Sequence, residues 1–201
     1  ANLFGLKEFG NIYSILGNPT VGALEARLTA LEEGAMCVAL SSGTSAVMYS
    51  LINIMSQGDN FVTANQLYGG TYTMFDNILP EYGINSKKVD ITDLEAVEAA
   101  IDEKTRAIYC ETITNPGLVV ADISALADIA HSKGIPLIVD ATFTTSAILK
   151  PFEYGADIVV YSLTKWMSGH GRVIAGAVIE KGGFDWGNGN FPLYDKPDTS
   201  Y

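Results

Sequence analysis

Short apolar runs alternate with amphipathic segments along almost the whole chain, and this alternation restricts the fold more than any other feature. Runs of four to six apolar residues bounded by turn formers are typical of strands buried on both faces. The first four of these runs are each followed by residues with helical spacing. Strands that alternate with helices form parallel sheets covered by those helices. We therefore predict an α/β domain with about seven strands in a mostly parallel sheet and helices on both faces.

The expected elements follow from this pattern. Strands are predicted at 35–40, 61–64, 84–89, 107–110, 136–140, 157–160 and 173–179. Helices are predicted at 21–33, from the residues after Ser45 to about Met55, and at 67–79, 93–101 and 122–133. For the first helix, Thr20 is the candidate N-cap and Gly34 the expected end.

Composition narrows the classes of partner. The chain of 201 residues is 48% hydrophobic and has a net charge of −11, so it is globular and acidic. Nucleic acids and anionic membranes attract basic surfaces, and we expect neither as a partner. No apolar run approaches the roughly 20 residues of a membrane span. Cys37 and Cys110 lie in apolar runs and are expected to be buried thiols, which fits a cytoplasmic protein without a signal peptide.

Three segments are expected along the chain. Residues 1–20 have few periodic apolar positions and are expected to form an arm. Residues 21–185 would form the main domain. Residues 186–201 are rich in turn formers and are expected to lead to a C-terminal domain outside this chain, which also begins without a methionine.

Lys165 follows the apolar run at 157–160, close to the hydroxyls of Ser162 and Thr164 and the glycines at 169 and 171. Desolvation at the end of a buried strand would lower the pKa of a lysine and free its amine as nucleophile or base. Such an amine beside anion donors suits a phosphorylated aldehyde bound as a Schiff base. The alternative is an ordinary exposed lysine after a strand.

Two further turns could line the same site. The stretch 41–45 places Ser42, Gly43 and Thr44 between a strand and a helix, an arrangement that directs backbone N–H groups at an anion. Many α/β turns have this sequence character without binding anything. Tyr68 precedes two glycines, so its ring could face a flat ligand, although such a tyrosine more often packs in the interior.

Asp140 ends the apolar run at 136–140, and a carboxylate in that position is either paired or functional. Ligands of open α/β sheets bind at the carboxyl ends of strands. Asp140 could keep the ring nitrogen of a pyridine cofactor protonated, or it could be the N-cap of the next helix. The position of Lys165, at the end of the following strand, favours the first interpretation.

With these residues in view, the chain resembles the Cys/Met-metabolism PLP-dependent enzymes over nearly its whole length, and most closely the O-acetylhomoserine sulfhydrylases among them. The residues that carry the resemblance are Tyr13-Ser14, 17–20, Ser42-Gly43, 67–71, Glu111-Thr112, Asn115-Pro116, Val139-Asp140, Thr142-Phe143, Ser162, Thr164-Lys165 and 169–171, with 184–192 and 197–201 for the narrower group.

The resemblance implies the large domain of the fold type I PLP-dependent transferases and a role for each matching residue. Lys165 would bond covalently to pyridoxal 5'-phosphate and later move protons. Asp140 would pair with the ring nitrogen and Tyr68 would stack on the ring. The remaining contacts would be Ser42, Gly43, Thr44, Ser162 and Thr164 near the phosphate, Asn115 near the ring hydroxyl, and Glu111 and Thr142 as weaker candidates.

The resemblance also implies a reaction and an assembly. The reaction would replace the acetate of O-acetyl-L-homoserine by sulfide or a thiol, giving homocysteine or methionine. Tyr13 would reach the phosphate bound in a neighbouring subunit of a homodimer or homotetramer. Two alternatives stay open: cystathionine γ-synthase or γ-lyase activity on a related substrate, and a non-catalytic remnant of the fold. Gly70 weakens the methionine γ-lyase reading, because those relatives usually carry a cysteine there.

Three departures from the family pattern bear on cofactor and substrate binding. The family usually has arginine after Tyr-Ser, where this chain has Ile15, so one charge partner of the phosphate is missing. The family usually has Asp-Asn-Thr, where this chain has Asp140-Ala141-Thr142. The C-terminal domain would supply the arginine that grips the substrate carboxylate. Metal binding is not expected, because His131 and His170 lack ligand-like spacing.

Overall fold

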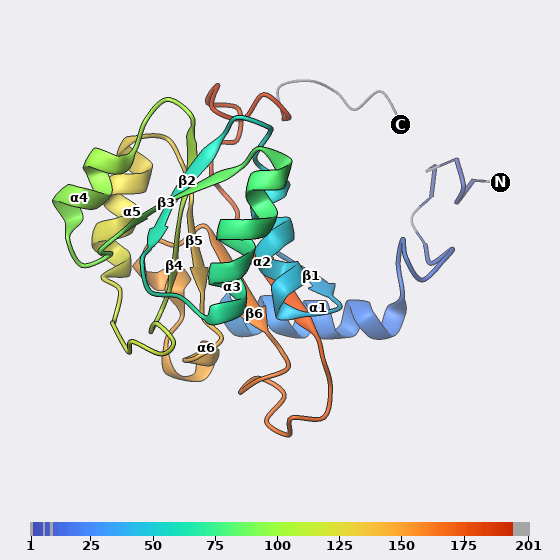
Figure 1. Cartoon of the computed structure of the whole chain (residues 1–201). Coiled ribbons are helices and arrows are strands. Elements are labelled where there is room, and N and C mark those ends of the chain that lie inside the picture. The colour runs from blue at the N-terminus through green and yellow to red at the C-terminus, as the bar shows by residue number, and fades with distance from the viewer. Residues whose placement is uncertain (1, 6, 9, 195–201) are drawn as a thin grey trace.

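A computed structural model describes residues 2–5, 7–8 and 10–194 of the chain, and these residues are organised around one seven-stranded sheet (Figure 1). The strands are β1 Met36–Leu40, β2 Asn60–Ala64, β3 Asn85–Val89, β4 Thr105–Glu111, β5 Leu137–Asp140, β6 Ile158–Ser162 and β7 Gly176–Glu180. Their order across the sheet is β1-β7-β6-β5-β4-β2-β3.

The predicted mostly parallel α/β sheet is confirmed, with one strand in the opposite direction. The five strands from β3 to β6 pair in parallel, whereas β7 is antiparallel to both β6 and β1. The reason is the connection: β7 follows β6 without a crossover helix, and such a return must run antiparallel. The register pairs Gly176 with both Leu40 and Ser162, so these three positions lie at one level of the sheet.

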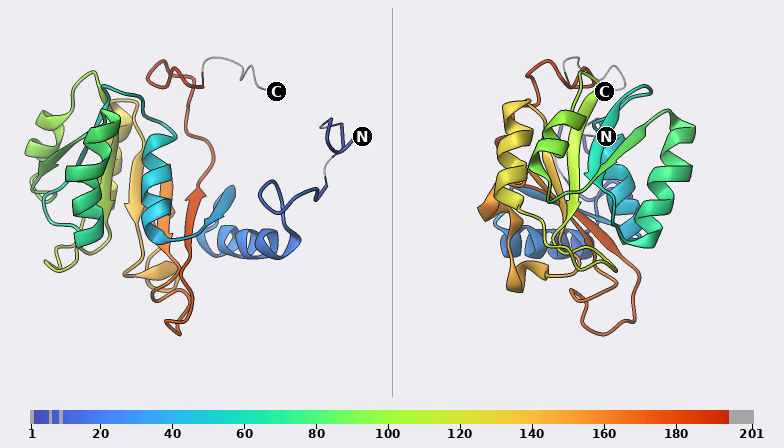
Figure 2. Two further views of the ribbon diagram at one scale, coloured as in Figure 1. Left: turned by 45° about the vertical axis from the view of Figure 1, so that its right-hand side comes forward. Right: turned by 60° about the vertical axis from the view of Figure 1, so that its left-hand side comes forward.

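Helices cover both faces of the sheet, as predicted. Figure 2 shows α4 and α5 on one face and α2 and α3 on the other, while α1 packs against the outer strands β1 and β7. The bounds are α1 Pro19–Glu32, α2 Gly43–Ile52, α3 Gly69–Thr73, α4 Leu94–Ala100, α5 Ile123–Ser132 and α6 Thr145–Ile148.

Several helical segments differ from the prediction. The segment expected as one helix at 67–79 is divided: α3 continues as a π-helical turn, Met74–Ile78, and then as a 3-10 turn, Leu79–Tyr82. Pro80 lies in that last turn, and proline cannot donate the backbone hydrogen bond that a continuing helix requires. The pattern also missed α6 and the 3-10 turn Pro151–Tyr154, since both are too short to show a period.

Both predicted ends of the first helix are wrong by one or two residues. Asn18, rather than Thr20, is the N-cap, because its Oδ1 accepts hydrogen bonds from the backbone N–H groups of Thr20 (2.9 Å) and Val21. At the other end Glu33, rather than Gly34, takes the left-handed conformation, at φ 59°. A glycine is needed at position 34 for a steric reason instead, because a Cβ there would lie 2.8 Å from Cγ2 of Ile179.

The two thiols and the last described segment pack into the domain. Cys37 and Cys110 are buried as expected, and burial raises the pKa of Cys37 to about 12. After β7, an irregular segment folds back so that Phe184, Trp186 and Phe191 form an aromatic cluster with ring centroids 4.6–5.8 Å apart. Its predicted continuation into a further domain stays a prediction, and residues 195–201 lie outside the described residues.

Over the described stretches, no helix combines the length and the apolar character that crossing a membrane requires.

Two glycines let the N-terminus of α2 approach the ends of β6 and β7. A Cβ on Gly43 would lie 2.4 Å from Cβ of Ser162, and a Cβ on Gly176 would lie 2.0 Å from the carbonyl oxygen of Ser42. Real Cβ atoms do not come this close to other atoms, so the turn before α2 fits the sheet only because both positions lack a side chain.

We expect Gly176→Ala to lower the free energy of unfolding by about 1–3 kcal/mol, because the added methyl group forces the backbone of Ser42 to move. Urea denaturation measures this. Gly22→Ala is the matched control: Gly22 lies inside α1 with no atom near its would-be Cβ, so alanine there should stabilise by about 0.5–1 kcal/mol. Equal effects of the two substitutions would contradict the close contact.

A buried carboxyl group joins α1 to β6. The side chain of Glu32 is 1% exposed and accepts a hydrogen bond from the hydroxyl of Tyr161. Burial raises the pKa of Glu32 above its ordinary value of 4.5, although the hydrogen bond from Tyr161 acts in the opposite direction. The neutral acid is therefore favoured in the folded chain over a range of pH in which the unfolded chain is already ionised.

This arrangement predicts a pH dependence. As pH rises above 4.5, the unfolded state loses the Glu32 proton before the folded state does, so the stability of the wild type should fall relative to Glu32→Gln. Urea titrations of both chains at several pH values measure the difference. Glu33→Gln is the control, because Lys150 lowers the pKa of the exposed Glu33 and gives the opposite sign. Parallel curves for Glu32→Gln and the wild type would refute the prediction.

Candidate active site

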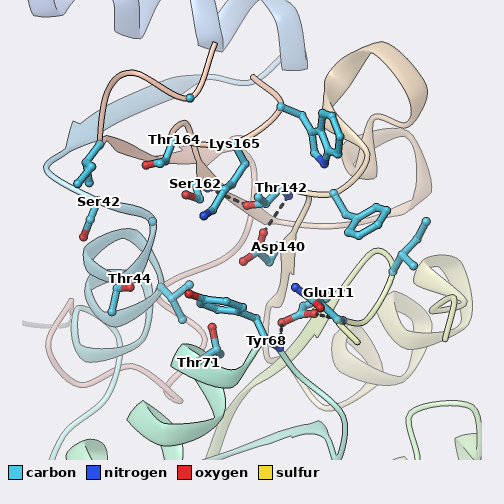
Figure 3. Close-up of a pocket in the computed structure, with 18 of the residues that line it drawn as sticks. Ser42, Thr44, Tyr68, Thr71, Glu111, Asp140, Thr142, Ser162, Thr164 and Lys165 are labelled. Carbon is cyan, nitrogen blue, oxygen red and sulfur yellow. Dashed lines mark hydrogen bonds between the residues drawn. The ribbon is translucent and has the colours of Figure 1, made fainter. Parts of the chain in front are cut away.

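The carboxyl ends of β4, β5 and β6 meet the N-terminal ends of α2 and α3 around one cavity of about 840 Å³ (Figure 3). Ten of the eleven residues predicted to bind the cofactor line it: Ser42, Gly43, Thr44, Tyr68, Asn115, Asp140, Thr142, Ser162, Thr164 and Lys165. Parallel strands bring their carboxyl ends to one edge, which is why residues far apart in the sequence converge here.

Lys165 lies just beyond the end of β6, and its amine points into the cavity on the side of Ser162 and Asp140 (Figure 3). The strand before it is buried as predicted. The expected desolvation of the lysine is not present, because Lys165 itself is exposed at the mouth of the cavity. The chain turns outward directly after Ser162, so the side chain leaves the protein interior.

Asp140 is the last residue of β5 and lies in register with Glu111 of β4. Its Oδ1 accepts the backbone N–H of Thr142 (2.9 Å), and its Oδ2 accepts the hydroxyl of Tyr109 (3.3 Å). Burial raises the pKa of Asp140, while these hydrogen bonds act against the rise. The N-cap interpretation is wrong, since α6 begins after Thr144. A buried carboxylate of this kind gains from a cationic ligand such as a protonated ring nitrogen.

The first turn of α2 forms an anion cradle, by which we mean residues 42–44 together with Ser162. The hydroxyl oxygen of Ser42 accepts the N–H of Ser45 (3.0 Å), which fixes the start of the helix. The N–H groups of Gly43 and Thr44 belong to the first turn, where a helix has no partner for them. Because Gly43 has no side chain, the hydroxyl of Ser162 lies beside them. A phosphate group matches such a set of donors.

Two threonines hold the strands around the cradle together. The hydroxyl oxygen of Thr142 accepts the backbone N–H of Ser162 (2.7 Å) and so ties β5 to β6. The hydroxyl of Thr164 accepts the N–H of Ala175 (3.1 Å) and donates to its carbonyl oxygen (3.3 Å). The chain that leaves β6 and the chain that enters β7 are thereby joined beside Lys165.

Tyr68 and Glu111 form the opposite wall of the cavity. Tyr68 is the residue before α3, and its ring is 48% exposed. Glu111, at the end of β4, accepts the backbone N–H groups of Tyr68 (2.7 Å) and Asn115 (3.1 Å). Burial raises the pKa of Glu111 to about 7, the two N–H groups act against the rise, and the charge of Asp140 adds to it.

Other wall residues were not among those predicted to bind the cofactor. They are mainly apolar or small: Val47, Thr71, Ile113, Phe143, Trp166 and Ile174. Apolar side chains of this kind look like ordinary packing residues in the sequence, so only the folded chain shows that they line the cavity. Glu111 did have a signal, since it ends a buried strand as Asp140 does.

Tyr13 is the one predicted site residue away from the cavity. It is 61% exposed, in the segment that stretches away from the domain before α1 (Figure 1). Its predicted contact with a neighbouring subunit stays a prediction. Ile15 lies in the same segment and is 81% exposed. Ala141, the other departure from the family pattern, is fully buried and does not line the cavity.

Within the described ranges, no group of three or more histidine, cysteine, aspartate or glutamate side chains could hold a metal ion. His131 instead contacts Asp157, with 2.8 Å between Nε2 and Oδ2.

The chain is similar to known proteins over its whole length. It is 47% identical to the O-acetyl-L-homoserine sulfhydrylase of Leptospira meyeri, a match that covers all of this chain and 46% of the relative. It is 46% identical to the homocysteine synthase of Schizosaccharomyces pombe, covering 99% of this chain and 47% of the relative. The chain therefore spans about half the length of these curated relatives.

A solved structure agrees with this similarity. A putative O-acetylhomoserine (thiol)-lyase of Campylobacter jejuni, whose crystal structure contains a pyridoxyl-lysine monophosphate, superposes with a TM-score of 0.95 at 40% identity, covering 100% of this chain and 50% of that one. The family model described as Cys/Met metabolism PLP-dependent enzyme matches residues 1–194. This chain belongs to the Cys/Met metabolism PLP-dependent enzyme family.

Proposed function

We propose that the protein to which this chain belongs replaces the acetate of O-acetyl-L-homoserine by sulfide or a thiol, using pyridoxal 5'-phosphate. With sulfide the products are homocysteine and acetate, and with methanethiol they are methionine and acetate. The observation that carries the proposal is the convergence of an amine, a buried carboxylate, an aromatic ring and an anion cradle on one cavity of about 840 Å³. The sulfhydrylase and homocysteine synthase names of the relatives support this reaction over others in the family.

The residues around the cavity fit the proposed cofactor in chemistry and in position. The anion cradle offers N–H and hydroxyl donors for the phosphate, and it is open because Gly43 has no side chain. Asp140 offers a carboxylate to the ring nitrogen, and Tyr68 an aromatic face to the ring. Lys165 brings the amine that bonds to the aldehyde. When bound, the cofactor withdraws electrons from the carbon skeleton of the substrate.

Each of these side chains has a task in the proposed reaction. The Nζ of Lys165 takes the proton from the α carbon of the substrate and returns a proton later. The Asp140 carboxylate holds a proton on the ring nitrogen, and its burial strengthens that ion pair because the surroundings have a low dielectric constant. Tyr68 would offer its aromatic face to one side of the ring. The substrate carboxylate needs a cation that we propose the remainder of the protein to supply.

The non-catalytic alternative is less well supported. A remnant of the fold has no physical need to keep Lys165, Asp140 and Tyr68 around one open cavity, and burying the Asp140 carboxylate costs stability. The exposed Tyr13 segment is consistent with a homodimer or homotetramer with shared active sites, in which a second copy would cover it. We propose a cytoplasmic location, where sulfide and acetylated amino acids are metabolised.

The covalent link can be tested directly. We expect the purified protein to develop visible absorbance with pyridoxal 5'-phosphate, and borohydride to fix the cofactor mass on the peptide that contains Lys165. Lys165→Ala should abolish both signals because no other amine is expected to react in the cavity. Lys104→Ala, which removes an exposed lysine before β4, is the matched control and should keep both. Fixation on other lysines in the Lys165→Ala chain would contradict the assignment.

The role of Asp140 gives a second test. Asp140→Asn should retain the covalent link but exchange the α hydrogen of O-acetylhomoserine for solvent deuterium roughly 100-fold more slowly, because a neutral amide does not hold the ring nitrogen protonated. Proton NMR in D₂O measures the exchange, with borohydride fixation as the control for cofactor loading. Exchange at the wild-type rate would show that the carboxylate is not needed for this step.

A further inference from the structure

Glu111 lines the cavity, yet both of its carboxylate oxygens are engaged by backbone groups. Glu111 is buried, with 5% of its surface exposed. Its Oε1 accepts the N–H of Tyr68 at 2.7 Å, and its Oε2 accepts the N–H of Asn115 at 3.1 Å. Figure 3 shows the Glu111 carboxylate beside Tyr68. One carboxylate thus joins two separate segments of the cavity wall to the end of β4.

The two segments that Glu111 joins are those that carry Tyr68 and Asn115 into the cavity. Tyr68 is the N-cap of α3 and has no side-chain hydrogen bond of its own to that helix. The same segments also touch next to Glu111: a Cβ on Gly117 would lie 1.6 Å from Oε1 of Gln66. The position of one segment therefore constrains the position of the other.

The ring of Tyr68 is constrained at a second point. A Cβ on Gly70 would lie 2.7 Å from Cε1 of that ring, so the ring lies directly on the backbone of the first turn of α3. Its other face remains free, consistent with the 48% exposure. With the ring resting on Gly70, its orientation follows the backbone of residue 68, and that backbone is held by Glu111.

We propose that Glu111 is a positioning residue that sets Tyr68 and Asn115 for cofactor binding, through the two backbone N–H groups that its carboxylate accepts. This inference rests on the proposed function, because the cofactor is the ligand whose binding it governs. Glu111 itself would not touch the reacting atoms. The two oxygens of one carboxyl group accept one backbone N–H each, so a single side chain holds two loops at once.

The test uses Glu111→Gln, which keeps the shape but turns one acceptor oxygen into an amide donor. We expect the dissociation constant of pyridoxal 5'-phosphate to rise roughly tenfold or more, and the visible circular dichroism of the bound cofactor to change. Without cofactor, hydrogen exchange should become faster at the amides of Tyr68 and Asn115. If Glu111→Gln does not fold, Glu111→Asp serves instead, because it keeps the charge but is too short to reach both amides.

Two comparisons separate positioning from a general loss of stability. Glu25→Gln is the matched control, because Glu25 also accepts a backbone N–H, that of Ala39 at 2.8 Å, on the outer strand β1. It should lower stability without changing cofactor affinity or circular dichroism. In a Tyr68→Ala background, Glu111→Gln should weaken binding clearly less than in the wild type.

The outcomes divide cleanly. If the Glu111 variants match the wild type in cofactor affinity, circular dichroism and amide exchange, this inference alone is overturned. An equal effect of Glu111→Gln with and without the Tyr68 ring also overturns it. A wild-type protein that forms no link with the cofactor overturns the proposed function, and the positioning role with it.

Discussion

The site depends on the close contact between the first turn of α2 and the ends of β6 and β7. Gly43 and Gly176 allow that contact, because a side chain at either position would overlap the opposing backbone or Ser162. Only this approach brings the N–H groups of a helix N-terminus beside the hydroxyl of Ser162, with Lys165 three residues beyond. The helix dipole acts over about one turn, so a shift of the helix by one turn would remove its effect on an anion.

Two carboxylates at the ends of adjacent strands have different hydrogen-bond partners. Asp140 and Glu111 are register partners, and burial raises the pKa of both. The two carboxylates differ in the groups that donate hydrogen bonds to them. Asp140 lines the cavity and accepts hydrogen bonds from Thr142 and Tyr109, whereas both oxygens of Glu111 accept backbone N–H groups of two loops. We therefore propose that the same functional group, at the same level of the sheet, serves a ligand in one strand and the protein's own backbone in the next.

The sequence predicts the parts of this site that follow from the sheet itself. Asp140 and Lys165 end apolar runs, and parallel strands collect such ends at one edge, so their convergence could be foreseen. Other features depend on contacts between distant segments. The reversed direction of β7, the short α6 and the exposure of Lys165 all follow from how the chain turns after a strand, which apolar periodicity does not encode. The N-cap at Asn18 was missed because the hydroxyl of Thr20 is also a good capping group, and only the geometry shows that the amide oxygen of Asn18 accepts the helix N–H groups.

The place of β7 between β1 and β6 also sets the order in which the domain can be completed. Leu40 and Ser162 both pair with Gly176, so the first strand of the sheet cannot join the others until almost the last described strand exists. Contacts between residues so distant in the chain are slow to form, because a long loop must close first. During synthesis on the ribosome, β1 and the turn before α2 would therefore wait for nearly the whole domain to emerge. The anion cradle is then among the last features to assemble, after the strands that carry Asp140 and Glu111.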